Sequence, residues 1–264
     1  MDTTQQNSNA WDKKVEEGSR YTQSVSSEII EKSKSGEWEI TVSTERSVPR
    51  DWFPKSLVGL KILCLASGGG QQGPILAAAG ADVIVTDISK KQLQQDEYVA
   101  KRDGLTIKTL QGDMSDLSDF KDEYFDIVVN PVSNLFVKDV NPVWKEVSRV
   151  LKNRGILIAG FTNPLLWIFD DNQERKGILD VKYSIPSSSL DYLQEDEVQA
   201  YIKSSQTIEY AHTLEDQIQG QIQGQIEAGF VITGFYEDDF GGTRILDKHI
   251  KTFITTRAIK LKIE

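Results

Sequence analysis

The chain has 264 residues, with 40 acidic against 30 basic side chains, a formal net charge of −10 and a pI near 4.9. Such acidity repels nucleic-acid backbones and anionic membranes, so we expect no nucleic acid as a partner. Cys64 is the single cysteine, which excludes an intrachain disulfide framework and a cysteine-rich metal site, and we predict no metal. The sequence has neither a leader pattern nor a run of about 20 apolar residues, so we expect a soluble, cytoplasmic protein without membrane insertion.

The first 56 residues do not follow the pattern of the rest of the chain. Residues 1–10 are polar and predict a disordered tail. Residues 11–56 contain three of the five tryptophans, and two prolines favour an extended stretch at 48–54. We therefore predict an N-terminal cap segment at 11–56, followed by one domain at 57–264.

From residue 61 onwards, short apolar runs alternate with helical periodicity, which is typical of a parallel sheet. The runs predict seven strands, at 62–66, 82–87, 105–110, 125–130, 155–161, 231–235 and 253–258. The predicted fold class is a doubly wound, Rossmann-like α/β domain whose sheet is mostly parallel, with an antiparallel C-terminal strand.

Three helices are predicted between these strands. One lies near 73–79, and a second runs from Ser89 to Asp103 and is closed by Gly104. The third has Asn141 as N-cap and Pro142 at its first position, with Gly155 as the stop.

An insertion at about 162–210 follows the fifth strand and is rich in aromatic residues: Trp167, Phe169, Tyr183, Tyr192, Tyr201 and Tyr210. With the N-terminal cap, it is expected to cover the ligand edge of the sheet. His212 follows it, either as a catalytic base or as the start of an exposed helix.

A duplicated tetrapeptide occupies residues 218–226, where I-Q-G-Q is repeated. Leu214, Ile218, Ile222 and Ile226 recur every four positions, which predicts an apolar stripe on a helix. The helix is either a lengthened surface helix or a partner-binding helix.

The loop S-G-G-G-Q-Q-G at 67–73 directly follows the first strand. Gly68, Gly70 and Gly73 match the spacing of a dinucleotide-binding turn, but the loop also suits S-adenosylmethionine or a plain tight turn. Asp87 ends the second strand, at the spacing where an acid accepts hydrogen bonds from ribose hydroxyls of either cofactor, unless it is an ordinary surface acid.

The end of the third strand, L-Q-G-D-M, distinguishes between the two cofactor hypotheses. Asp113 is expected to accept from the adenine amine, with Met114 and Ile88 against the two ring faces, although Asp113 also suits a cap for the turn that follows. A second mononucleotide half is missing after this strand, which favours S-adenosylmethionine over a nicotinamide cofactor.

Residues 60–164 resemble the class I S-adenosylmethionine-dependent methyltransferases of the ubiquinone/menaquinone-methylase-like type, through L-A-S-G-G-G, V-T-D-I-S, Q-G-D-M, F-D-I-V and W-K-E-V-S-R-V-L-K-N-R-G-I-L. The resemblance implies that the methyl group passes by in-line displacement to a small-molecule acceptor. The expected cofactor-binding residues are Ala66, Ser67, Gly68, Gly69, Gly70, Gln72, Asp87, Ile88, Gly112, Asp113, Met114 and Asn130.

Two positions depart from the family pattern. Cys64 stands where the family usually has an acid, and Ala66 replaces a glycine. Tyr21, Arg50 or Gln72 are candidates to compensate for the missing acid.

We expect Tyr21, Trp52 and Asn130 on the substrate side as catalytic candidates, with simple packing as the alternative for either aromatic. N-P-V-S at 130–133 is similar to the signature of amino-group methyltransferases but ends in serine. A nicotinamide-dependent oxidoreductase and a non-catalytic S-adenosylmethionine-binding protein remain alternatives. The sequence makes no prediction of oligomeric state.

Overall fold

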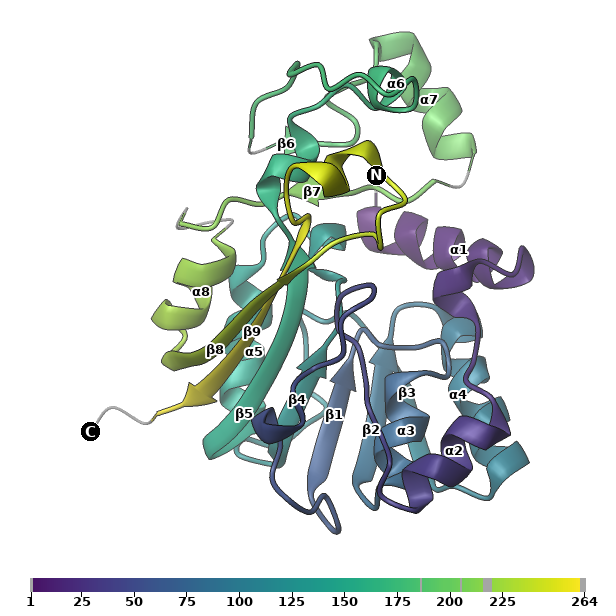
Figure 1. The fold of residues 1–264 in the computed structure, drawn as a ribbon, viewed down its shortest axis with the longest axis vertical. Helices are drawn as coiled ribbons and strands as arrows, with labels where there is room; N and C mark the ends of the chain where they lie inside the picture. The colour runs from purple at the N-terminus through teal and green to yellow at the C-terminus, as the bar shows by residue number, and fades with distance from the viewer. Residues whose placement is uncertain (1, 186, 205, 216–219, 262–264) are drawn as a thin grey trace.

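The computed structural model describes residues 2–185, 187–204, 206–215 and 220–261, and within them seven strands form one sheet in the order β3-β2-β1-β4-β5-β9-β8 (Figure 1). The bounds are β1 Lys61–Leu65, β2 Asp82–Asp87, β3 Ile107–Gln111, β4 Phe125–Asn130, β5 Leu151–Thr162, β8 Phe230–Asp238 and β9 Phe253–Lys260. β1 to β5 are parallel, whereas β9 is antiparallel to both of its neighbours. The predicted strands and fold class are confirmed.

Helices cover both faces of the sheet because alternate strand residues point to opposite sides. Ile62 and Cys64 of β1 belong to the core beneath α3 (Gln72–Ala78) and α4 (Lys90–Asp103). Leu63 and Leu65 belong to the opposite core, which contains α5 (Asn141–Val150). The sheet is therefore buried on both faces, and its ligand edge lies where the parallel strands end.

The boundaries predicted for the third helix are corrected. Val140 is the N-cap and Asn141 already lies inside α5. The helix ends at Val150, and the fully buried Leu151 is already extended and pairs with Phe125. Gly155 consequently lies within β5 and does not stop the helix.

The predicted disordered tail at 1–10 is wrong for the residues from Thr3 onwards, which belong to α1 (Thr3–Glu16). The polar side chains that suggested disorder make tertiary hydrogen bonds. Asn7 is fully buried, donates to the backbone oxygens of Phe136 (3.2 Å) and Ile208 (3.0 Å), and accepts from the Ile208 N–H (2.7 Å). Figure 1 shows α1 lying across the carboxyl ends of the strands.

The rest of the N-terminal segment packs on the face that carries α3 and α4. It contains η1 (Arg20–Thr22), α2 (Ser27–Lys34) and η2 (Arg50–Trp52), and α2 lies beside α3 and α4 in Figure 1. Trp38 and Phe53 meet edge to face with ring centroids 5.1 Å apart inside the core.

The chain after β5 builds a small layer beyond the carboxyl ends of the strands (Figure 1). This layer contains η4 (Pro164–Trp167), α6 (Asp171–Glu174), β6 (Ser187–Ser188), α7 (Glu195–Lys203) and β7 (Tyr210–Ala211), and η5 (Ile245–Lys248) follows β8. Within the described ranges, no helix is both long and apolar enough to cross a membrane.

The predicted apolar stripe of the duplicated tetrapeptide is wrong in α8 (Gln221–Glu227), where Gln221 and Gln225 are buried and Ile226 is 50% exposed. Gly224 explains why this face of α8 turns toward α5. A Cβ at this position would lie 2.6 Å from the Trp144 ring, so only glycine lets α8 approach α5 this closely. Gln225 also accepts from Thr256 (3.1 Å). Ile218 lies outside the described residues, and Leu214 precedes the helix.

We expect Asn7→Ala to lower the free energy of unfolding by about 2–4 kcal/mol, because the buried N–H and C=O of Ile208 lose their partners. Asn9→Ala is the matched control, since Asn9 is exposed on the same helix and should change stability by less than about 0.5 kcal/mol. Denaturant unfolding measures both variants. Equal stability of the two variants would show that α1 is not anchored through Asn7.

Candidate functional site

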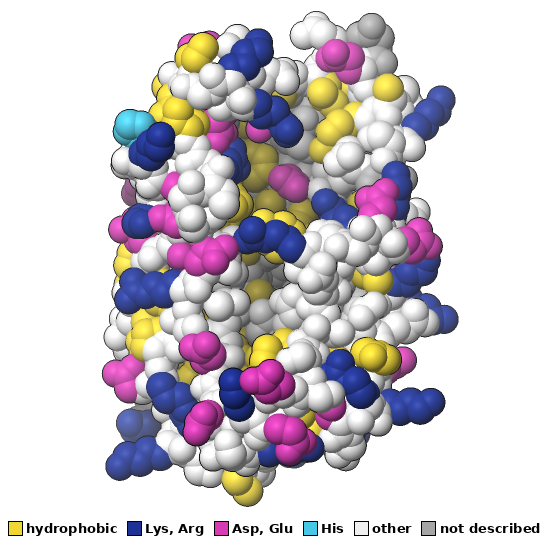
Figure 2. Space-filling view, turned by 45° about the vertical axis from the view of Figure 1, so that its right-hand side comes forward, with side chains coloured by type: hydrophobic (Ala, Val, Ile, Leu, Met, Phe, Trp, Pro, Cys, Tyr) yellow, Lys and Arg dark blue, Asp and Glu magenta, His cyan; other side chains and the backbone are white. Residues whose placement is uncertain are grey.

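A pocket of about 840 Å³ lies at the carboxyl ends of the strands, between the N-terminal segment and the layer after β5. Figure 2 shows the molecular surface hollowed, with hydrophobic side chains inside the hollow and charged groups around it. Segments far apart in the sequence line this pocket: Trp11, Tyr21 and Thr41 from the N-terminal part, Ala66 to Gly68 and Asp87 from the sheet edge, and Trp167, Phe169, Tyr192 and Glu209 from the later layer.

The glycine loop after β1 is held by two buried carboxyl groups. The Gly68 N–H donates to Asp87 Oδ2 (3.0 Å), and the N–H groups of Gly69 and Gly70 both donate to Asp96 Oδ2 (3.0 and 3.1 Å). A phosphate-binding loop needs free N–H groups facing its ligand. This loop does not meet that condition, because its three successive glycine donors are taken.

The residues that flank the glycines fix the path of the loop. Ala66 has φ = 47°, a left-handed conformation that glycine adopts more easily, which explains why glycine suits this position. Ser67 Oγ donates to Gln72 Oε1 (3.1 Å), and Gln72 Nε2 donates to the Thr41 carbonyl (2.9 Å). Gln72 thereby joins the loop to the N-terminal segment, and Ala66, Ser67 and Gln72 all line the pocket.

Asp87 ends β2 at the pocket, as expected for a residue that contacts the ribose. Its Oδ1 accepts from the Ser89 N–H (2.9 Å), so both oxygens already bind backbone donors. Burial raises the pKa of the Asp87 carboxyl to about 6, and the hydrogen bonds from Ser89 and Gly68 oppose this rise. The Asp87 carboxyl therefore changes between its neutral and ionised forms just below neutral pH.

Ile88 and Met114 line the pocket, but Asp113 and Gly112 do not. Asp113 Oδ1 accepts from the N–H (2.8 Å) and hydroxyl (2.7 Å) of Ser115, while Oδ2 accepts from Thr4 of α1 (2.9 Å). These contacts match the alternative interpretation of Asp113 as a cap for the turn that follows. The Gly112 N–H donates to the Asp87 carbonyl (3.0 Å).

α1 covers this part of the pocket, where its second half belongs to the predicted cap from residue 11 and its first half was predicted to be disordered. Ser8 Oγ donates to the Ile88 carbonyl (2.9 Å), and Asp12 Oδ1 accepts from Ser89 Oγ (2.6 Å). Trp11 and Lys14 line the pocket from the same helix. The spacing Ser8, Trp11, Asp12 marks one helical face, but only the tertiary contacts distinguish it from a polar tail.

Tyr21 lines the pocket and is 46% exposed, whereas the other two catalytic candidates do not line it. Trp52 lies against Tyr236 of β8, with ring centroids 5.4 Å apart, so its expected place on the substrate side is wrong. Asn130 is fully buried, and its amide donates to the Leu65 carbonyl and to Ser133 Oγ (both 2.9 Å). It therefore supports the sheet edge beneath Ser133, which does line the pocket.

Arg50 also lies away from the pocket, stacked on Trp38 at 3.8 Å, and so does not compensate for the missing acid. His212 is buried, its Nε2 lies 3.0 Å from the Asn134 carbonyl, and burial lowers its pKa. His212 does not line the pocket, and no helix begins there, so both readings of this residue are corrected.

The aromatic chamber is the part of the pocket formed by Trp167, Phe169, Tyr183, Tyr192 and Phe240. Tyr183 and Tyr192 stack with ring centroids 3.9 Å apart.

Most acids that line this end of the pocket are paired with a base: Asp170 with Lys182, Asp171 with Arg175, and Glu174 with Arg244. Glu209 forms no ion pair with a described residue, and burial raises the pKa of its carboxyl. The sequence alone gave no signal for Glu209, which follows a polar stretch.

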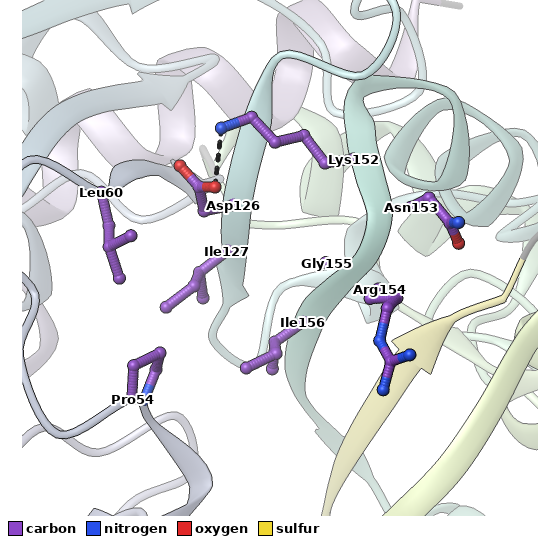
Figure 3. A pocket seen from close by; sticks show the side chains of 9 residues that line it. All are labelled: Pro54, Leu60, Asp126, Ile127, Lys152, Asn153, Arg154, Gly155 and Ile156. Atoms are coloured by element: carbon purple, nitrogen blue, oxygen red, sulfur yellow. Dashed lines mark hydrogen bonds and ion pairs between the residues drawn. The ribbon is translucent and has the colours of Figure 1, made fainter.

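A second, smaller hollow of about 190 Å³ lies at the opposite end of the parallel strands, beside the start of β4 and of β5 (Figure 3). Its charged groups are already engaged, because Lys152 pairs with Asp126 (2.7 Å) and Asp126 also accepts from the Lys61 N–H (2.9 Å). In the described part of the chain, no group of three or more His, Cys, Asp or Glu side chains is arranged to hold a metal ion. The larger pocket is therefore the candidate functional site.

Comparison with known proteins agrees with this geometry. A family model described as a methyltransferase domain matches residues 63–159. The chain is 54% identical over 255 residues to the uncharacterized methyltransferase YbaJ of Bacillus subtilis (strain 168), covering 97% of each chain. It is 31% identical over 112 residues to a ubiquinone biosynthesis O-methyltransferase of Pelagibacter ubique (strain HTCC1062), covering 42% of this chain and 46% of that protein.

A solved S-adenosylmethionine-dependent methyltransferase from Mesorhizobium loti has the same fold, with a TM-score of 0.59 and 17% identity over 80% of this chain and 95% of that chain. The full-length match to YbaJ extends the relationship beyond the sheet to the N-terminal segment and the later layer. The chain is a class I S-adenosylmethionine-dependent methyltransferase.

Proposed function

We propose that this methyltransferase modifies a small-molecule acceptor bound in the aromatic chamber, while Asp87, Ile88 and Met114 hold the adenosine part of the cofactor. The observation that carries the proposal is the glycine loop with its N–H groups donated to Asp87 and Asp96. Such a loop disfavours a pyrophosphate, because its three glycine N–H donors are already taken and cannot face the phosphates. S-adenosylmethionine carries a sulfonium and no phosphate, so it fits where a dinucleotide does not.

The bound cofactor would supply a methyl group on a positively charged sulfur: a lone pair of the acceptor bonds to the methyl carbon as the carbon–sulfur bond breaks, and the sulfur leaves as a neutral thioether. The chain's own residues have to orient the two reactants and exclude water. Orientation alone accounts for up to ~7–11 kcal/mol in favourable intramolecular reactions. Asp87 is suited to accept from the ribose hydroxyls, and the side chains of Ile88 and Met114 offer apolar surfaces for the adenine.

The enclosure of the pocket supports a small acceptor. The N-terminal segment contributes Trp11 and Tyr21, and the layer after β5 contributes the aromatic chamber, so both sides of the sheet edge are covered. Aromatic faces also attract the cationic sulfur through cation–π interaction. A cytoplasmic setting agrees with the single, buried Cys64 thiol.

S-adenosylhomocysteine should bind more tightly as the pH rises through about 6, because the ionised Asp87 is the better acceptor for ribose hydroxyls. Below pH 6, the bound state must displace a proton, so the affinity should fall by up to about tenfold per pH unit. Calorimetry between pH 5 and 8 measures this dependence. NADH should give no saturable binding.

Asp87→Asn should bind S-adenosylhomocysteine more weakly, by on the order of 2 kcal/mol, and should lose the pH dependence near 6. A dependence near 8 would belong to Asp96, because burial raises the pKa of its carboxyl to about 8. Asp82→Asn is the matched control, because Asp82 is exposed at the other end of the same strand. An Asp87→Asn variant that titrates like the wild type would remove Asp87 from the cofactor site.

Methyl-labelled S-adenosylmethionine should transfer its label to the low-molecular-mass fraction of a cell extract and not to its protein or nucleic acid. Tyr21→Ala should lower the initial rate about tenfold while S-adenosylhomocysteine affinity changes less than about threefold, because Tyr21 lies at the acceptor side in this proposal. Tyr98→Ala is the control, since Tyr98 is 55% exposed on α4 and does not line the pocket. Label found in macromolecules would refute a small-molecule acceptor.

A further inference from the structure

Cys64 cannot hold the glycine loop in the way that an acid on β1 would. The residue is fully buried, and burial, with Asp96 nearby, raises the pKa of its thiol, so it stays protonated. A neutral thiol is a weak acceptor. The buried N–H groups of the loop consequently need an acceptor from another element.

Asp96 provides this acceptor from α4. It lies between Leu93 and Val99 on the buried stripe of the helix and is fully buried itself. One of its oxygens accepts from two successive N–H groups, those of Gly69 and Gly70. A carboxyl group at an apolar stripe position is the sequence signal that identifies it, since burying such a group is costly unless it serves as an acceptor. Its Oδ2 is the acceptor here, whereas Oδ1 is buried without a hydrogen-bond partner among the described residues.

The surroundings of Asp96 are shaped to admit its carboxyl group. A Cβ at Gly73 would lie 2.6 Å from Val85 Cγ2 and 3.1 Å from Asp96 Oδ1, so glycine there leaves room for the acid. Asp96 is not among the residues that line the pocket. Any effect on a ligand must therefore pass through the loop.

We propose that Asp96 is a positioning residue that supplies, from α4, the carboxyl group that an acid at position 64 would otherwise supply from β1, and thereby holds the glycine loop in its cofactor-binding path. The consequence for cofactor binding rests on the proposed function. The two acids hold different glycines of the loop. Asp87 accepts from the Gly68 N–H and lines the pocket, whereas Asp96 accepts from the N–H groups of Gly69 and Gly70 and does not line the pocket.

Moving the carboxyl group from position 96 in α4 to position 64 in β1 tests the proposal. Asp96→Ala should weaken S-adenosylhomocysteine binding at least tenfold, and the double variant Cys64→Asp/Asp96→Ala should restore it to within about threefold of the wild type. Cys64→Asp alone should lower the melting temperature, because it buries a second carboxyl group beside Asp96. Glu97→Ala is the control, since Glu97 is an exposed acid on the same helix.

Amide hydrogen exchange in the cofactor-free protein measures directly whether the N–H groups of the loop are hydrogen-bonded. Gly70 should exchange at least tenfold faster in Asp96→Ala than in the wild type and should regain protection in the double variant. Gly69 should lose less protection, because its N–H also donates to the Gln92 carbonyl (3.0 Å). Asp96→Asn, which keeps an acceptor oxygen, should resemble the wild type and guards against a misfolded Asp96→Ala.

The outcomes separate the two proposals. Unchanged exchange at Gly70 in Asp96→Ala, or a folded double variant without renewed protection at Gly70, would overturn the role of Asp96. A wild type that fails to bind S-adenosylhomocysteine would instead contradict the proposed function, while exchange would still decide whether Asp96 holds the loop.

Discussion

The site depends on buried carboxyl groups that satisfy the backbone N–H groups of the glycine loop. Close approach of a ligand requires glycines, but glycine loops expose N–H groups that must find acceptors once water is excluded. Asp87 at the end of β2 and Asp96 in α4 provide them. Because Ser89 caps α4 directly after β2, one short stretch of sequence sets the positions of both acids.

The cover of the pocket is built from polar contacts as much as from apolar packing. α1 is held over the sheet edge by Asn7, Ser8 and Asp12, whose partners are mostly backbone groups of distant loops. The later layer adds the stacked pair Tyr183 and Tyr192. Both parts line the pocket, and they also contact each other directly through Asn7 and Ile208.

Much of the fold could be predicted from the sequence because alternating apolar runs and helix caps are local signals. The seven strands, the glycine loop and the position of Asp87 followed from them. Polar residues that are buried by tertiary contacts gave no such signal at the start of α1, so residues 1–10 were interpreted as a disordered tail. Asp96 was missed although its place between Leu93 and Val99 on the buried stripe of α4 marks it. Trp52 was misplaced for the converse reason, since an aromatic residue packs equally well against Tyr236 as against a ligand.

The central claim is that the glycine loop is already held by the protein before any cofactor binds. Amide hydrogen exchange at Gly68, Gly69 and Gly70 in cofactor-free wild-type protein tests it most directly. The account predicts strong protection at all three, comparable to that of the flanking strand β1, and little further change when S-adenosylhomocysteine is added. Rapid exchange at these glycines in the free protein, with protection appearing only on ligand binding, would contradict it.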